Sequence, residues 1–196
     1  MTEYQWDKKL NIKTTGRDAS NSDGFNNPYE PTPYSVLDRL FKNGYITDKN
    51  VVCDYGCGKG RVSFFLSRFV GCRTIGIEHD QNLWQQAMEN KQNFCCHDEV
   101  QFLCQKAEDF NCISADCFYF FNPFSIEVFK SVMKNIMTSY YQSPRPIKLF
   151  FYYPDDEYLS YLLAGNIDEL YFLDEIDCRD LFDKDDSSER IMIFEL

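Results

Sequence analysis

Short apolar runs alternate with longer amphipathic segments through most of this chain. Apolar runs of this length predict strands. Seven strands are predicted, at residues 50–54, 73–78, 100–105, 117–122, 148–153, 169–176 and 190–195. Apolar residues at helical spacing predict intervening helices at 62–69, 80–93, 125–141 and 155–163. The last two strands follow one another without a helix, as in an antiparallel hairpin, so the pattern as a whole predicts an α/β fold with a mostly parallel sheet.

The chain ahead of the first predicted strand has two parts. Residues 1–28 are polar and contain the turn cluster Asn21-Ser22-Asp23-Gly24, so we expect an N-terminal arm or lid there. Apolar positions between Val36 and Phe41 then recur at helical spacing and predict a helix that ends near Gly44. Residues 29–196 are therefore expected to form a single domain.

Size and charge narrow the class of protein. The chain has 196 residues and a mass of 23.2 kDa, which suits one domain with an ordinary hydrophobic core. Its net charge of -11 argues against unselective binding to nucleic acid, because phosphate backbones attract clustered lysine and arginine. No apolar stretch approaches the ~20 residues of a membrane helix, so a cytoplasmic protein with no membrane partner is expected. The nine cysteines include no Cys-x-x-Cys pair, and no metal site is expected.

The most specific pattern is Val-Val-Cys-Asp-Tyr-Gly-Cys-Gly-Lys-Gly-Arg at residues 51–61. Gly56, Gly58 and Gly60 allow positive φ angles and would open backbone N–H groups to a ligand, as in a cofactor loop between a strand and a helix. A dinucleotide-binding loop would have its third glycine where Arg61 stands, and the Asp54 carboxylate would repel a pyrophosphate. Asp54 is instead suited to accept hydrogen bonds from a zwitterionic amino acid.

This loop resembles the first motif of the class I S-adenosylmethionine-dependent methyltransferases. The resemblance implies S-adenosylmethionine as cofactor and a three-layer Rossmann-like fold, with helices on both faces of a seven-stranded, mostly parallel sheet of order 3-2-1-4-5-7-6. It also implies that Glu78 binds the ribose hydroxyls and that Ala107 and Glu108 contact adenine. These cofactor motifs resemble those of protein arginine methyltransferases, although the double-glutamate substrate loop of that family is absent here.

The segment Tyr29-Glu-Pro-Thr-Pro-Tyr34 precedes the glycine loop and its helix. It resembles the start of the non-SET lysine methyltransferases, in which the equivalent stretch folds over the methionine part of the cofactor. The resemblance implies that Tyr29, Thr32 and Tyr34 contact the cofactor or line the active site. The alternative is a stiff turn that leads into a helix, because the two X-Pro bonds restrict the backbone in either case.

The fourth predicted strand ends in Asn122-Pro123-Phe124, at the sheet edge where open α/β folds bind ligands. This triplet resembles the Asn-Pro-Pro-Tyr/Phe motif of amino methyltransferases that act on adenine, cytosine or glutamine, with one proline missing. The resemblance implies a catalytic lip in which Asn122 and the Pro123 carbonyl accept from a target amine and Phe124 stacks on it. The alternative is a strand end and a proline turn ahead of a helix capped by Ser125.

The sequence thus predicts a methyltransferase that transfers a methyl group from S-adenosylmethionine to an acceptor nitrogen on a protein side chain or small molecule. Three alternatives stay open at this point: a base N-methyltransferase on RNA or DNA, a non-catalytic cofactor-binding partner module, and a dehydrogenase. The motifs define the cofactor site and leave the acceptor unidentified.

Overall fold

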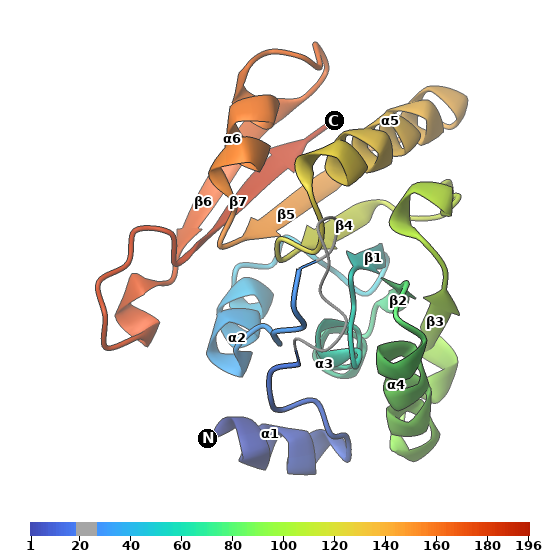
Figure 1. Cartoon of the computed structure of the whole chain (residues 1–196), viewed down its shortest axis with the longest axis vertical. Coiled ribbons are helices and arrows are strands. Elements are labelled where there is room, and N and C mark those ends of the chain that lie inside the picture. The colour runs from blue at the N-terminus through green and yellow to red at the C-terminus, as the bar shows by residue number, and fades with distance from the viewer. Residues whose placement is uncertain (19–26) are drawn as a thin grey trace.

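The computed structural model of the chain describes residues 1–18 and 27–196. In this part of the chain, seven strands form one sheet in the order β3-β2-β1-β4-β5-β7-β6 (Figure 1). The strands are β1 (Val51–Tyr55), β2 (Arg73–Glu78), β3 (Val100–Cys104), β4 (Cys117–Phe120), β5 (Lys148–Tyr152), β6 (Tyr171–Asp177) and β7 (Arg190–Glu195). Neighbours from β3 to β5 pair in parallel, whereas β7 runs antiparallel to both β5 and β6. The predicted fold and strand order are confirmed.

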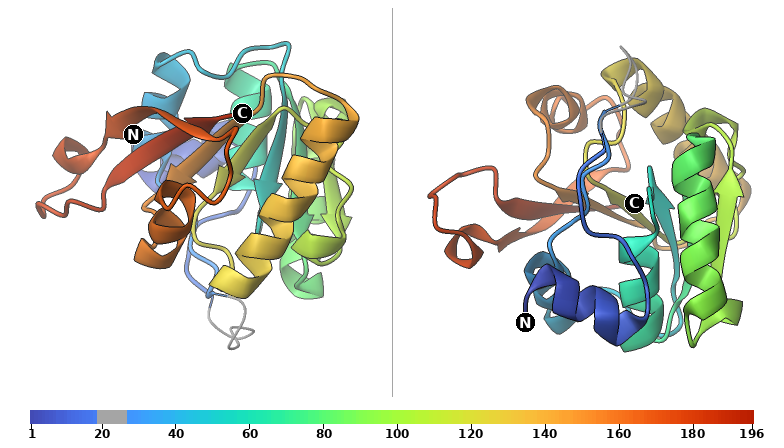
Figure 2. Two further views of the ribbon diagram at one scale, coloured as in Figure 1. Left: turned by 90° about the horizontal axis from the view of Figure 1, so that it is seen from above. Right: turned by 60° about the horizontal axis from the view of Figure 1, so that its bottom comes forward.

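The helices cover both faces of the sheet (Figures 1 and 2). The α-helices are α1 (Glu3–Leu10), α2 (Tyr34–Lys42), α3 (Arg61–Phe69), α4 (Gln81–Asn93), α5 (Ile126–Gln142) and α6 (Asp156–Leu163). Short 3₁₀ turns occur at His97–Glu99, Ala107–Asp109 and Arg179–Leu181. None of the helices in the described part of the chain has the length and apolar character that a membrane crossing requires.

Two apolar clusters form the core, one on each face of the sheet. One contains side chains from α1 to α4 together with the strand residues Val52 and Tyr119. The other contains side chains from α5 and α6 together with Cys53 and Phe118, the chain neighbours of those two residues. Since successive residues of a strand point to opposite faces, the apolar residues of the central strands contribute to both clusters.

The first residues contain a helix that the sequence analysis did not anticipate. Helix α1 begins with a capping box between Thr2 and Gln5, and its last residue, Leu10, is buried in the core. Trp6 stacks on Tyr34 of α2 with their ring centroids 5.4 Å apart. The turn cluster Asn21–Gly24 lies outside the described residues, and the role of residues 1–28 as a lid stays a prediction.

A buried polar network fastens this helix to the domain. Asp7 accepts hydrogen bonds from the backbone N–H groups and hydroxyls of Thr14 and Thr15 and from the Tyr34 hydroxyl, at 2.6–2.9 Å. The Arg61 guanidinium, at the start of α3, lies 3.8 Å from Asp7 and also forms an ion pair with Glu3. Because Arg61 is only 2% exposed, its charge requires these acidic partners.

We expect the substitution Asp7→Asn to lower the free energy of unfolding by about 2–4 kcal/mol at pH 7, because it leaves Arg61 and the donors around it incompletely paired. Burial raises the pKa of Asp7, but hydrogen bonds from Thr14, Tyr34 and Thr15 outweigh it and leave the pKa below its usual value. The carboxylate therefore stabilises the fold above about pH 4, and this contribution is lost as the pH falls through the lowered pKa. Urea unfolding at several pH values measures it, with the exposed Asp48→Asn as control. A loss no larger than that of the control would contradict the assigned role of the network.

Candidate functional site: a cofactor cavity and its acceptor lip

The glycine loop connects β1 to α3, and its glycines allow close packing against two other segments. Gly56, Gly58 and Gly60 have φ angles of 70°, 54° and 87°. A Cβ atom on Gly56 would lie 2.4 Å from the Cβ of Pro123, and one on Gly58 would lie 2.2 Å from the Tyr29 ring. The first two glycines therefore bring the lip and the segment around Tyr29 against the loop, while Gly60 starts α3 in the left-handed conformation.

The backbone N–H groups of this loop are mostly used within the protein. Gly56 and Cys57 donate to the Ile77 carbonyl oxygen at 2.9 and 3.0 Å, and Gly58 donates to Glu78 Oε2 at 2.8 Å. The expectation that the glycines open these N–H groups to a ligand is therefore wrong for residues 56–58. The N–H groups of residues 56–58 are thus not available to a pyrophosphate, which argues against the dehydrogenase alternative.

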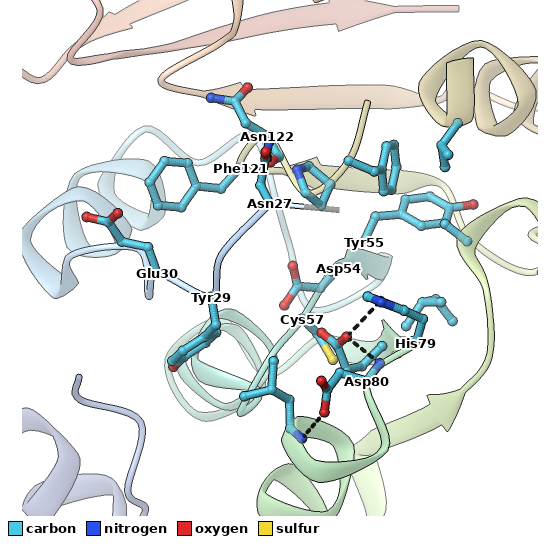
Figure 3. A pocket seen from close by; sticks show the side chains of 18 of the residues that line it. Asn27, Tyr29, Glu30, Asp54, Tyr55, Cys57, His79, Asp80, Phe121 and Asn122 are labelled. Carbon is cyan, nitrogen blue, oxygen red and sulfur yellow. Dashed lines mark hydrogen bonds and ion pairs between the residues drawn. The ribbon is translucent and has the colours of Figure 1, made fainter. Parts of the chain in front are cut away.

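Asp54 is the unusual group of the site. Its side chain is 4% exposed, lines the cavity, and has an oxygen, Oδ2, without a hydrogen-bond partner among the described residues. Burial, together with the negative charge of Glu78, raises the pKa of this carboxyl to about 8. In Figure 3 it lies near the centre of the cavity, with Tyr29 and Glu30 on one side and Tyr55 and His79 on the other. A buried acceptor of this kind is suited to a cationic donor such as an ammonium group.

Glu78 stands at the end of β2 and is fixed in place by the backbone. Its Oε2 accepts from the N–H of Gly58, and its Oε1 accepts from the N–H of Asp80 at 2.9 Å. His79 Nδ1 lies 3.3 Å from the same Oε1. A carboxylate can accept about four hydrogen bonds, so Glu78 retains capacity for the two hydroxyls of a ribose. Holding the glycine loop is a second role that the sequence did not indicate.

The cavity around these carboxylates has a volume of about 510 Å³. Ala107 and Glu108, in the turn after β3, line it as expected for an adenine pocket, and Asn135 of α5 fixes the turn by donating to the Glu108 carbonyl oxygen at 2.6 Å. The predicted cofactor residues found in its lining are Tyr29, Thr32, Asp54, Gly56, Glu78, Ala107 and Glu108. Gly58, Gly60 and Tyr34 are not part of that lining.

The segment from Asn27 to Pro33, here called the strap, covers the cavity. The Tyr29 ring lies on Gly58, and its hydroxyl donates to the Thr14 carbonyl oxygen at 2.6 Å. The Thr32 hydroxyl lies 3.1 Å from that of Tyr119, and the Thr32 carbonyl accepts from Arg61 Nη1 at 3.1 Å. The strap is thus fastened to the same arginine that holds the N-terminal helix.

Tyr34, which the sequence predicted to contact the cofactor or line the active site, is not among the residues that line the cavity. Its side chain is fully buried, its hydroxyl donates to Asp7, and the Arg61 guanidinium lies 4.2 Å from its ring centroid. Tyr29 and Tyr34 stand at the two ends of the same motif, but α2 begins at Tyr34, and the helix directs its ring into the core. Tyr34 therefore packs against Arg61, and its influence on the cavity is indirect.

The predicted lip lines the cavity, but the Asn122 side chain turns away from it. Asn122 Nδ2 donates to the Tyr153 carbonyl oxygen at 2.6 Å, and Oδ1 accepts from the Asp155 N–H at 2.9 Å. Figure 3 shows the amide directed away from Asp54. Its φ angle of 42° is rare for a residue with a side chain, so the two hydrogen bonds hold a strained turn. The amide in this structure joins the ends of β4 and β5.

The other two lip residues are engaged in packing. The Pro123 carbonyl oxygen accepts from the Asn27 N–H at 3.2 Å, and the Asn122 carbonyl oxygen accepts from the Asn27 side chain at 2.8 Å. Phe124 is 4% exposed and packs against Tyr55, so its ring is not available to stack on a flat acceptor. Catalytic roles for Asn122, Pro123 and Phe124 stay predictions, and the geometry favours a supporting role.

Two residues to which the sequence assigned no role in the site also line the cavity. Arg61 is buried, and its guanidinium donates a hydrogen bond to the Thr32 carbonyl oxygen. Phe121, directly before the lip, lines the cavity and packs against Tyr152. In the sequence, only the position of Arg61 at the end of the glycine loop could have indicated a role in the site. Its acidic partners, residues 3 and 7, are too distant in the chain to reveal that it is buried.

The fold and cavity together are those of a Rossmann-like methyltransferase, with a ligand-sized cavity at the carboxyl ends of β1 and β2. Comparison with known families agrees, since residues 52–145 match the model described as "Methyltransferase domain". This match spans just under half of the chain, and together with the cofactor motifs of the sequence it identifies a class I S-adenosylmethionine-dependent methyltransferase.

Two curated proteins match parts of the chain. A "Histone-lysine N-methyltransferase, H3 lysine-79 specific" of Dictyostelium discoideum is 44% identical over 55 residues, which cover 28% of this chain and 3% of that protein. A "Protein-lysine N-methyltransferase" of Saccharolobus islandicus is 30% identical over 64 residues, which cover 32% of this chain and 40% of that protein. The chain therefore spans less than half the length of either relative.

Among solved structures, an RNA methyltransferase from Salinibacter ruber in complex with S-adenosyl-L-homocysteine has the same fold. It superposes with a TM-score of 0.53 and 21% identity, over 85% of this chain and 92% of that one. At this level of identity the likeness extends to the fold alone.

The cavity fits S-adenosylmethionine in its chemistry. The unpartnered oxygen of Asp54 is suited to the ammonium group of the methionine part, and Glu78 is suited to the ribose hydroxyls. Two carboxylates also favour a cofactor that carries a positive sulfonium, and the Tyr29 ring adds an aromatic face to the cavity wall.

We expect cofactor binding to release about one proton at pH 7, because Asp54 is protonated in the free protein and ionises beside an ammonium group. Calorimetric titration with S-adenosylmethionine at pH 7, in two buffers of different ionisation enthalpy, measures this release. The variant Asp54→Asn should bind more weakly and release no proton through this group. Equal binding enthalpies in the two buffers for the unsubstituted protein would contradict the assignment.

For Asn122→Ala, we expect a loss of about 1–2 kcal/mol in the free energy of unfolding, since two hydrogen bonds across a strained turn disappear. Turnover should fall as well, with cofactor affinity close to that of the parent, because the turn borders the acceptor side of the cavity. Chemical denaturation and calorimetry measure the two effects, with Asn166→Ala, which removes one exposed side-chain bond, as control. Reduced turnover without any loss of stability would instead indicate direct contact between Asn122 and the acceptor.

Proposed function

We propose that the chain transfers a methyl group from S-adenosylmethionine to the amine nitrogen of a lysine side chain in a protein. The observation that carries this proposal is the pair of sequence matches, at 44% and 30% identity, to two proteins that are both described as lysine N-methyltransferases. The net charge of -11 supports a basic polypeptide as partner.

The cofactor supplies an electrophilic methyl group, so that the acceptor nitrogen forms the new N–C bond with its lone pair while the electrons of the S–C bond remain on sulfur. The protein side chains bind the two substrates and align the acceptor nitrogen with the methyl group. Asp54 and Glu78 would hold the two polar ends of the cofactor, and the strap, fastened through Thr32 and Arg61, would cover it. Alignment and exclusion of water contribute up to ~7–11 kcal/mol to such displacements. The attacking amine must be neutral, and the proton that it loses passes to a nearby carboxylate or to water.

The alternative of a base N-methyltransferase has less support from the lip. Stacking on a flat base requires an exposed ring, and the Phe124 ring is buried against Tyr55. The carbonyl oxygens of Asn122 and Pro123, which would accept from an exocyclic amine, are bonded to Asn27. The overall negative charge opposes binding to a phosphate backbone as well.

The test uses S-adenosylmethionine with a trideuterated methyl group, incubated with the purified chain and with poly-L-lysine, poly-L-arginine or RNA. We expect mass spectrometry of hydrolysed products to find deuterated methyllysine, and Glu78→Gln to weaken cofactor binding by about 1–3 kcal/mol and lower the yield accordingly. Label in RNA would favour the base methyltransferase instead. Cofactor binding without label in any polymer would favour a non-catalytic module.

A further inference from the structure

A second hollow, of about 490 Å³, borders the cofactor cavity on the other side of the strap. Residues of the strap and of the β4 end line both spaces: Asn27, Pro28, Glu30, Phe121 and Asn122. A single layer of side chains therefore separates the two.

Four of the eleven residues that line this hollow are aromatic. Phe121 and Tyr152 pack with ring centroids 4.7 Å apart, and Tyr152 and Tyr153 lie edge to face at 6.3 Å. Phe182, in the connection between β6 and β7, lines it as well. Aromatic walls suit an alkyl chain, and their faces attract a cation at its end.

The charge in this hollow is predominantly negative. Glu189 and Glu30 line it, and the single basic residue in its lining, Arg17, lies 3.6 Å from Glu30 with both side chains mostly exposed. Glu189 accepts a hydrogen bond from the Tyr152 hydroxyl at 2.6 Å, and among the described residues no lysine or arginine forms an ion pair with it. Its pKa is raised, first by burial and further by Asp186 and Glu30. Glu189 is thus a half-buried carboxylate suited to a cationic partner.

The backbone at this hollow is held in a strained shape. Asn122 and Tyr153 have φ angles of 42° and 48°, and apart from the helix cap Asn11 they are the non-glycine residues with positive φ in the described chain. They are hydrogen-bonded to each other, and the Tyr153 hydroxyl donates to Asp186 at 2.7 Å. Strain that is fixed by several interactions at the ends of adjacent strands is typical of functional sites.

We propose that this hollow is the acceptor subsite, which takes the alkyl-ammonium side chain of lysine from a basic polypeptide, with Phe121, Tyr153 and Phe182 around the alkyl chain and Glu189 at its ammonium group. This inference rests on the proposed function and gives the place where the lysine side chain would bind. An RNA acceptor would bring phosphates next to Glu30 and Glu189, which disfavours it at this entrance. The amine passes from this hollow toward the cofactor at the wall formed by Phe121, Asn122 and the strap.

The decisive variant is Glu189→Gln, which keeps an acceptor for the Tyr152 hydroxyl and removes the charge. We expect its KM for poly-L-lysine to rise about tenfold, as for the loss of a hydrogen bond to a charged group, with kcat and cofactor affinity close to those of the parent. The matched control is Glu99→Gln, an exposed acid in the His97–Glu99 turn that lines neither space. Thermal unfolding of both variants shows whether the fold is preserved.

A binding measurement makes the subsite testable without turnover. With S-adenosyl-L-homocysteine present, Nα-acetyl-L-lysine methylamide should shift the amide NMR signals of Tyr153, Phe182 and Glu189, and the norleucine analogue, which lacks the ammonium group, should shift them far less. These shifts without methyl transfer to any polymer would support the subsite and contradict the proposed function. Methyl transfer to poly-L-lysine with an unchanged KM in Glu189→Gln, or shifts confined to other residues, would overturn the subsite and leave the function standing. The absence of any shift would also overturn the subsite. So would methyl transfer to RNA that increases in the Glu189→Gln variant.

Discussion

The buried guanidinium of Arg61 is the interaction on which the arrangement of this site depends. It contacts the acidic residues Glu3 and Asp7 of α1, the Thr14 hydroxyl and the carbonyl oxygen of Thr32 in the strap. An arginine at the amino end of a helix is unfavourable with respect to the helix dipole, and an unpaired buried charge costs far more. The N-terminal segment therefore supplies the charges that make this position tolerable, and in doing so it holds the strap over the cofactor cavity.

The glycine loop also brings separate segments of the chain together at the site. Its N–H groups are donated to Ile77 and Glu78, and the missing side chains make room for Pro123 and the Tyr29 ring. The loop therefore gathers the lip and the strap around Asp54, whose buried carboxyl lacks a full set of partners. This arrangement suits a cofactor with a cationic amino acid end and excludes one with a pyrophosphate in that place.

Two adjoining spaces with different linings divide the work of the proposed reaction. The cavity at β1 and β2 has carboxylates for the polar groups of the cofactor, whereas the hollow beyond the strap has aromatic rings and Glu189 for a cationic chain. The Asn122 turn lies between them and is held by Tyr153 and Asp155. In the proposed reaction, the ends of β4 and β5 and the β6–β7 connection would determine the choice of acceptor, while β1 and β2 would bind the cofactor.

The sequence by itself determined the fold and predicted the cofactor half of the site, because both depend on local patterns. Apolar strands between amphipathic helices define the sheet, and Asp54, Glu78 and Ala107 lie at or shortly after the carboxyl ends of their strands, so the parallel topology brings them to one edge. Tertiary structure decided the rest. Several features depend on contacts between residues far apart in the chain. They are the docking of α1, the packing of Tyr34 against Arg61, the link that the Asn122 amide makes between two strands, and the position of Glu189 beside the strap. Such partners leave no periodic trace in a sequence, since a buried polar group requires a complement in space and not at any fixed spacing.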